Sequence, residues 1–191
     1  MILLAALLLG LLAGSAWAHW RKQPYRAPEL KSVWLVPAAL VPQLAVAYLP
    51  AATRYSASWA TSTALPLSLV VFLVFVWLNR GLAGMRILLV GLVLNLLVIS
   101  FNGGWMPISP HTASHLPGGS DGPGNSPGSR FGQKDILLLP QDTRVEFLSD
   151  RFLLPDWLHY ATAFSLGDVF VAVGAFWLLA YQRAAPNSKL E

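Results

Sequence analysis

Long apolar runs that carry almost no charge constrain this chain more than any other feature of its sequence. Of its 191 residues, 55% are hydrophobic and 12% are charged, and the mean hydropathy is +0.54. A soluble domain carries about 25% charged residues, so a soluble globule and a disordered tail are disfavoured. The chain has no cysteine, which excludes disulfides and thiolate metal sites. The composition therefore predicts an integral membrane protein.

The apolar runs are interpreted as membrane-spanning helices. A bilayer core of about 30 Å needs about 20 residues of helix, and fewer where the membrane thins. We therefore expect an all-α fold, one membrane domain over 1–191, with five transmembrane helices and one long outer loop between the fourth and the fifth. The expected helices cover 2–18, 33–49, 59–78, 82–101 and 165–181, and the outer loop covers 102–164 with a flexible linker at 117–130.

The distribution of lysine and arginine predicts the orientation. Cytoplasmic loops of membrane proteins are enriched in these residues. In a five-helix topology the basic residues of 19–32, of 79–86 and of the C-terminal tail share one side. We therefore expect the N-terminus outside and the C-terminus in the cytoplasm, in a bacterial inner membrane. The formal net charge of +4 is explained by this pattern and does not indicate a nucleic-acid partner.

Small residues recur every four positions along the first apolar run. Such a stripe lets two helix backbones approach closely in lipid. The sequence does not show whether the partner helix belongs to this chain or to another. The stripe consists of Ala6, Gly10, Gly14 and Ala18.

Two motifs mark helix ends at the edges of the outer loop. Asn102, Gly103 and Gly104 can adopt the left-handed positions that terminate a helix, and Pro107 prevents its continuation. Ser165 followed by Asp168 has the spacing of a capping box at the start of the last helix.

The order of several motifs resembles an uncharacterised family of small bacterial integral membrane proteins. The pattern comprises Asn95 in the fourth apolar run, NGGWMPIS at 102–109, DTR at 142–144 and FSLGD at 164–168. The resemblance covers nearly the whole chain. It implies a polytopic bacterial membrane protein, and it carries over no activity, cofactor or catalytic residue.

Three polar residues lie nearest the middle of the apolar runs. Gln43, Asn95 and Asp168 would form one cluster if all three faced inward. Buried polar side chains in membrane helices most often bond a neighbouring helix, but an intramembrane acid is also a functional candidate. The cluster is therefore interpreted as helix packing or, alternatively, as a site for a transported ion or solute.

His111 and His115 are the only pair that invites a metal interpretation. Their spacing of four places both on one helix face. The pattern lacks the glutamate of the metalloprotease motif, and spacing determines no third ligand, although His159 lies later in the loop. We therefore predict no metal site, no cofactor and no catalytic residue.

These observations favour a non-catalytic accessory or assembly subunit of a larger membrane complex, with an energy-converting complex as one candidate host. The expected partners are the lipid bilayer and other membrane subunits. The alternative is a small-solute or ion transporter that uses Gln43, Asn95 and Asp168. A membrane-embedded enzyme is the hypothesis that the residues support least.

Overall fold

A computed structural model describes residues 2–48, 58–119, 126–132, 134–155 and 160–181. Part of the linker expected at 117–130, His159 and most of the C-terminal tail lie outside these residues. The α-helices of the described chain are α1 (Ile2–Trp20), α2 (Leu35–Tyr48), α4 (Ser58–Leu78), α5 (Met85–Phe101), α6 (Pro110–Ser114) and α7 (Leu166–Ala180).

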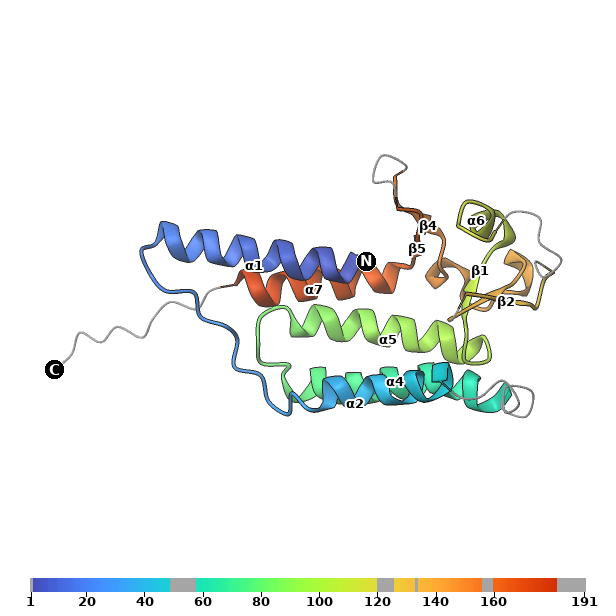
Figure 1. The fold of residues 1–191 in the computed structure, drawn as a ribbon, viewed down its shortest axis with the longest axis horizontal. Helices are drawn as coiled ribbons and strands as arrows, with labels where there is room; N and C mark the ends of the chain where they lie inside the picture. Colours follow the sequence, from blue (N-terminus) through green and yellow to red (C-terminus); the bar gives the residue numbers. More distant parts are fainter. Residues whose placement is uncertain (1, 49–57, 120–125, 133, 156–159, 182–191) are drawn as a thin grey trace.

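The longer helices pack side by side in the order α1, α7, α5, α4, α2 (Figure 1). The helices α2, α4 and α5 are neighbours both in sequence and in this row, whereas α7 is distant in sequence from both of its neighbours, α1 and α5. The buried core of the row contains Phe75, Val76, Met85, Leu88 and Val171. Each helix is buried mainly by its immediate neighbours, so large parts of its surface stay exposed.

Local sequence explains where these helices begin and end. Gly84 adopts a left-handed conformation (φ 81°) immediately before α5, and the backbone N–H of Asn102 closes its last turn. Ser165 caps the start of α7. Pro42 and Pro66 lie inside α2 and α4, where each removes one backbone donor.

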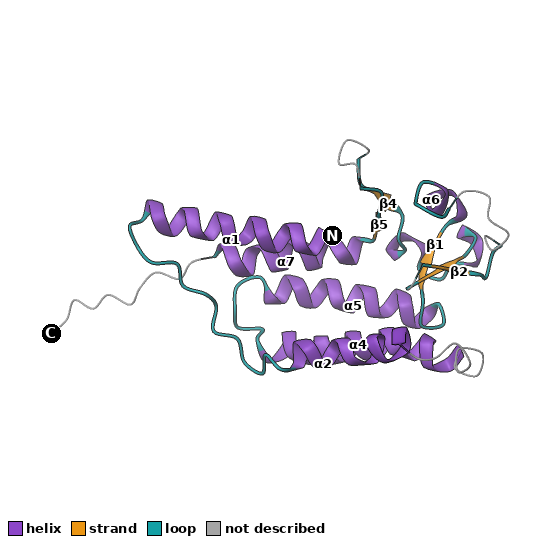
Figure 2. Ribbon diagram, in the orientation of Figure 1, coloured by secondary structure: helices purple, strands orange, loops and turns teal. Residues whose placement is uncertain are grey.

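The residues between α5 and α7 fold into a separate region that we call the cap (102–119, 126–132, 134–155 and 160–164). It lies at one end of the helical row, opposite the C-terminal ends of α1 and α7 (Figure 2). Its core contains Ile108, Ala113 and Leu137. It holds α6, the 3₁₀ turns η1 (Pro140–Asp142) and η2 (Glu146–Leu148), and the strands β1 (Met106–Ile108), β2 (Arg130–Phe131), β3 (Asp135–Leu137), β4 (Phe152–Leu153) and β5 (Ala163–Phe164).

The cap strands form two small sheets. In the first, β3 lies between β1 and β2, pairing parallel with β1 and antiparallel with β2. In the second, β4 and β5 are antiparallel. An isolated bridge between Ile108 and Asp150 links β1 to the segment that follows η2.

The fold class predicted from the sequence is wrong. The structure is mixed α/β, because the expected outer loop forms short strands. Among the described residues one helix, α1, is long and apolar enough to cross a membrane, where five were expected. The apolar stretches of α2, α4, α5 and α7 have 10–17 residues. A helix such as α7, with 15 residues, is about 23 Å long and shorter than a bilayer core of about 30 Å.

The small-residue stripe of α1 packs against α7 of the same chain. Gly10, Gly14 and Ala18 are buried, and Ala6 is half-buried. A Cβ atom at Gly10 would lie 2.7 Å from the carbonyl oxygen of Phe176, and one at Gly14 would lie 2.3 Å from that of Leu179. The structure thus places the partner of this stripe within the protein.

The other side of α7 contacts α5 through glycines that the sequence analysis did not single out. A Cβ at Gly174 would lie 2.8 Å from the carbonyl oxygen of Gly84, and one at Gly167 would lie 2.9 Å from that of Gly91. Gly84 and Gly91 are seven residues apart in sequence, and so are Gly167 and Gly174. Because the two spacings are equal, the glycines match across the antiparallel contact of α5 and α7. The equal spacing in 84–91 and 167–174 is the sequence signal that was missed.

The close approach of α1 and α7 predicts that Gly14→Ala destabilises the protein. Overpacking costs about 1–3 kcal/mol, which exceeds the gain of about 1 kcal/mol in helix propensity. We expect a net loss of up to about 2 kcal/mol, measured as a lower Tm in mild detergent. Gly81→Ala is the matched control, since a Cβ at Gly81 meets nothing within 4 Å. A Gly14→Ala protein as stable as the Gly81→Ala protein would contradict the close contact.

Candidate functional site

The ends of α5 and α7 that face the cap are joined by a hydrogen-bonded polar cluster. Asn95 Nδ2 donates to Asp168 Oδ1 at 2.8 Å, and Ser165 Oγ donates to Asn95 Oδ1 at 3.0 Å. Ser165 is fully buried and Asn95 is 9% exposed. Two residues predicted to share a polar cluster therefore do meet. Their bonds lie between helices, continuing the α5–α7 contact one turn beyond Gly91.

Asp168 also serves the start of its own helix. Its backbone N–H donates to Ser165 Oγ at 3.1 Å, and its Oδ2 accepts from the Ser165 backbone N–H at 3.2 Å, which is a complete capping box. The carboxylate in the first turn also interacts favourably with the helix dipole. Both carboxylate oxygens of Asp168 therefore accept hydrogen bonds, one from α5 and one from the N-cap of α7.

Gln43 lies apart from this cluster. It is exposed on α2, which packs on α4 and is separated from α7 in the row by α4 and α5. The three polar groups that suggested a shared ion or solute site are thus not brought together by the fold.

The turn that follows α5 anchors the cap. Asn102 Nδ2 donates to the carbonyl of Arg144 at 2.8 Å, and Asn102 Oδ1 accepts from the Arg144 backbone N–H at 3.0 Å. Gly103 and Gly104 both have positive φ, and a Cβ at Gly104 would lie 1.7 Å from the carbonyl oxygen of Ser62. Pro107 is buried in β1. The NGG and DTR motifs therefore meet through backbone and amide groups, while the Arg144 side chain is exposed.

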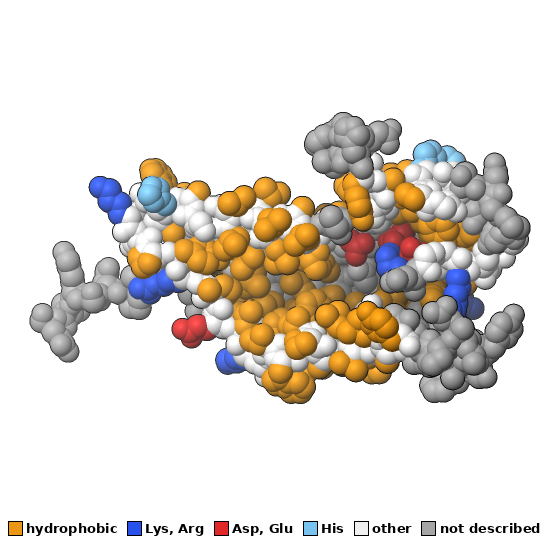
Figure 3. Space-filling model, viewed as in Figure 1, with side chains coloured by type: hydrophobic (Ala, Val, Ile, Leu, Met, Phe, Trp, Pro, Cys, Tyr) orange, Lys and Arg blue, Asp and Glu red, His pale blue; other side chains and the backbone are white. Residues whose placement is uncertain are grey.

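A buried acidic group that sequence analysis missed lies beside these motifs. The side chain of Asp150 is 0% exposed, and its Oδ2 accepts a hydrogen bond from Lys134 Nζ. The same Lys134 nitrogen lies 2.9 Å from Asp135 Oδ1. Asp150 Oδ1 is buried and has no hydrogen-bond partner in the described structure. Figure 3 shows acidic and basic side chains gathered where the apolar helical surface meets the cap.

Burial dominates the ionisation of this acidic group. It raises the pKa of Asp150 to about 6, against the opposing effect of Lys134 and with a further increase from the charges of Asp135 and Asp168. The pKa of Asp135 is also raised, chiefly by burial. Burial lowers the pKa of Lys134, but the two adjacent carboxylates outweigh it, and the pKa is raised overall.

The sequence carries no local signal for this group. Lys134 and Asp150 come together because β1 pairs with β3 and also forms a bridge to Asp150, two residues after η2. A parallel contact between such short strands leaves no periodicity in the sequence, so the ion pair was not predictable from spacing.

The two histidines lie on the cap surface. His111 and His115 are exposed on and just after α6, with ring centroids 5.1 Å apart, and His115 Nδ1 lies 2.9 Å from the His111 carbonyl oxygen. Within the described ranges, no group of three or more His, Cys, Asp or Glu is placed to hold a metal ion.

The comparisons with known proteins show the family. The model of a family of unknown function, DUF5317, matches residues 28–180, which is most of the chain. The protein therefore belongs to the DUF5317 family. In the comparisons with curated proteins and with solved structures, nothing matches this chain. The predicted resemblance to an uncharacterised family is confirmed at this level, and the assignment of its motifs stays a prediction.

The double role of Asp168 predicts that Asp168→Asn loosens the junction of α5, α7 and the cap. An amide retains one acceptor where the carboxylate used two, so one bond of the cluster is lost. Loss of a cap or of one such bond costs about 1 kcal/mol. We expect a lower Tm for Asp168→Asn and an unchanged Tm for Asp142→Asn, whose side chain is exposed on η1. Equal stability of the two variants would contradict the assigned role.

The raised pKa of Asp150 predicts a specific pH dependence of stability. Because its folded pKa of about 6 lies above the unfolded value of 3.8, the folded state binds the proton more tightly. Stability contributed by Asp150 is then fully present below pH 3.8 and is lost as the pH rises through about 6. Chemical unfolding at pH 4 and pH 7 should show a larger decrease for the native protein than for Asp150→Asn. An identical decrease in Asp150→Asn, with Asp142→Asn as control, would contradict the assignment.

Proposed function

We propose that this protein is a non-catalytic accessory or assembly subunit of a larger membrane complex in the bacterial inner membrane. The proposal rests mainly on one observation, which is the large apolar surface along the row of helices (Figure 3). Monomeric soluble proteins rarely expose apolar patches larger than a few hundred Å². Lipid and partner helices are the surroundings in which such a surface is stable.

The two outermost helices of the row carry much of this surface. On α1, Leu9 is 58% exposed and Leu12 is 66% exposed, and on α2, Val41 is 60% exposed. A row has two free edges, whereas a closed bundle has none. These edges are where further helices of a complex would pack.

The polar residues support an architectural role. Asn95, Ser165 and Asp168 bond one another, and Asp168 is engaged at both oxygens. The alternative of a transporter depended on Gln43 joining this cluster, and the exposed position of Gln43 on α2 gives it no support. The accessory role is therefore the better interpretation.

The predicted orientation belongs to the same proposal. If α1 crosses the membrane, Arg21, Lys22 and Arg26 follow its C-terminal end. From the excess of basic residues on cytoplasmic segments, we propose that the N-terminus and the cap lie outside and the C-terminus in the cytoplasm.

Site-specific photo-crosslinking in native membranes tests the proposal. A photoreactive residue at Leu12 or at Val41 should give crosslinks to the same partner protein, because these positions lie on the edges of the row. A probe at His111 on the exposed cap surface is the control for non-specific capture. Native mass analysis of the protein purified in mild detergent should then show that partner in stoichiometric amount.

Two results would contradict the accessory role. One is a chain that purifies only as a monomer or homo-oligomer. The other is a crosslinking pattern at Leu12 and Val41 that contains lipid alone. Either would require a function that this chain performs without partners.

A further inference from the structure

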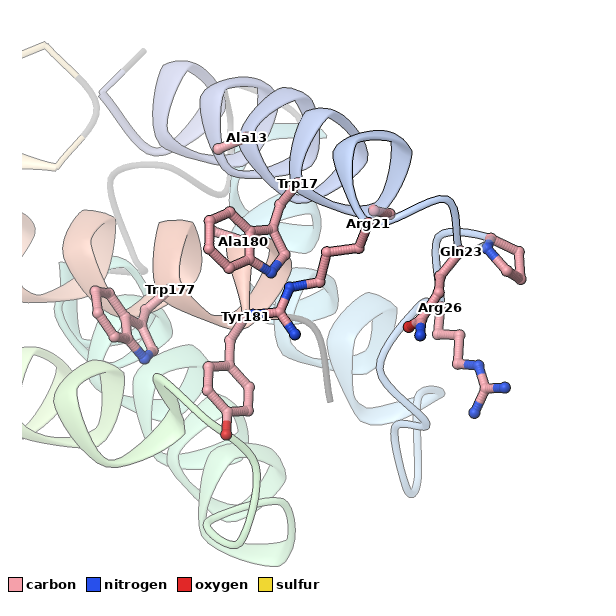
Figure 4. Close-up of a pocket in the computed structure, with 10 residues that line it drawn as sticks. Ala13, Trp17, Arg21, Gln23, Arg26, Trp177, Ala180 and Tyr181 are labelled. Atoms are coloured by element: carbon pink, nitrogen blue, oxygen red, sulfur yellow. The ribbon is translucent and has the colours of Figure 1, made fainter. Parts of the chain in front are cut away.

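A pocket of about 500 Å³ lies between the C-terminal ends of α1 and α7, at the opposite end of the row from the cap (Figure 4). Trp17 and Arg21 line it from α1 and the turn that follows it, and Trp177 and Tyr181 line it from α7 and its C-cap. Arg26 borders it from the connection to α2. None of the described residues that line it is acidic.

Arginine and aromatic side chains meet in this pocket. The Arg21 guanidinium lies 4.9 Å from the centroid of the Trp17 ring, and its side chain extends toward Tyr181 (Figure 4). Trp17, Trp177 and Tyr181 are each about half exposed, at 43%, 50% and 52%. Arginine presents several donors to a phosphate, and exposed Trp and Tyr rings at helix ends are typical of the headgroup level of a membrane.

Helix C-terminal ends disfavour anions, so this opposing effect has to be weighed. At this pocket most of the terminal carbonyl groups are already bonded. The carbonyl of Trp17 accepts from the Arg21 N–H, that of Ala18 from the Gln23 N–H, and that of Leu179 from the Tyr25 hydroxyl. The Arg21 guanidinium therefore lies beside a helix end whose partial negative charge is largely engaged.

We infer that this pocket binds the phosphate group of an anionic phospholipid. Arg21 contacts the phosphate, Arg26 adds positive charge at the border of the pocket, and the Trp17 and Trp177 rings lie against the glycerol and upper acyl region. The location agrees with the position of α1, the helix long enough to cross a membrane, since the pocket lies at its end. The inference rests on the proposed membrane location, and it adds a lipid class and a site.

Lipid binding is measured on the full chain in an uncharged detergent after delipidation. Phosphatidylglycerol, phosphatidylcholine and inorganic phosphate are added separately, and native mass analysis gives the bound fraction for each. Phosphatidylglycerol should bind the unaltered protein at least tenfold more tightly than phosphatidylcholine. In the double variant Arg21→Gln/Arg26→Gln this preference should fall about tenfold, as expected when charge-assisted hydrogen bonds are lost.

Arg80→Gln is the matched control. Arg80 also stacks on a tryptophan, 4.5 Å from the Trp77 ring centroid, but it lies outside the pocket. It should keep the lipid preference. The helix content and the lipid-free Tm of all variants should match those of the unaltered protein, which excludes misfolding as the cause.

Three outcomes would overturn the inference. They are equal binding of the two lipids, an equal loss of preference in Arg80→Gln, and binding of inorganic phosphate as tight as that of phosphatidylglycerol, which would indicate a soluble anion. Because lipid binding is measured in detergent without partner proteins, its failure is distinct from failure of the accessory role. Specific lipid binding without any co-purifying partner would leave the inference standing and refute the proposed function alone.

Discussion

Direct backbone contact on both sides of α7 is the interaction on which the rest of the structure depends. Gly10 and Gly14 bring α1 against one side, and the pairs Gly84–Gly174 and Gly91–Gly167 bring α5 against the other. Close van der Waals contact between the backbones replaces side-chain packing at these positions, and the attraction summed over many such atom pairs stabilises the row. A side chain at any of these positions would separate α7 from a neighbour. Because α7 is the last of the described helices and lies between α1 and α5, α1 joins the row only when α7 docks.

The polar residues extend this contact into the cap. One turn beyond Gly91, Asn95 reaches the first turn of α7 and bonds Asp168 and Ser165. Asn102 then binds the backbone of Arg144 on both its N–H and its carbonyl, and Asp150 lies buried beneath Lys134. The same end of the helical row is thus held by amides, a capping box and an ion pair in succession. This order explains why the sequence motifs gather at one end of the molecule although they are spread over 95–168.

How much of the fold and of the site could be predicted from the sequence depends on how far apart in sequence the interacting residues lie. The apolar runs indicated where helices lie, and the Ala6–Ala18 spacing indicated a close helix contact, because both signals are local. Helix-end chemistry at Asn102 and Ser165 is also local and could be interpreted from residue type. The predicted number of membrane-crossing helices and the all-α class were wrong. The length of a helix depends on where caps such as Gly84 make it begin or end, and the strands of the cap form only through distant pairing. The same dependence on distant pairing hid Asp150, while the exposed position of Gln43 reflects which face of α2 meets α4.

The most direct test of this account is solid-state NMR of the protein in lipid bilayers, with ¹³C in the glycine backbone. Cross-peaks between Gly84 and Gly174 and between Gly91 and Gly167 are expected, because these backbones approach closely across the α5–α7 contact. Their presence would establish that α7 docks on α5 in a membrane through its glycines. A spectrum that retains helical shifts for all four glycines but lacks both cross-peaks would contradict the packing on which the cap, the polar junction and the row of helices depend.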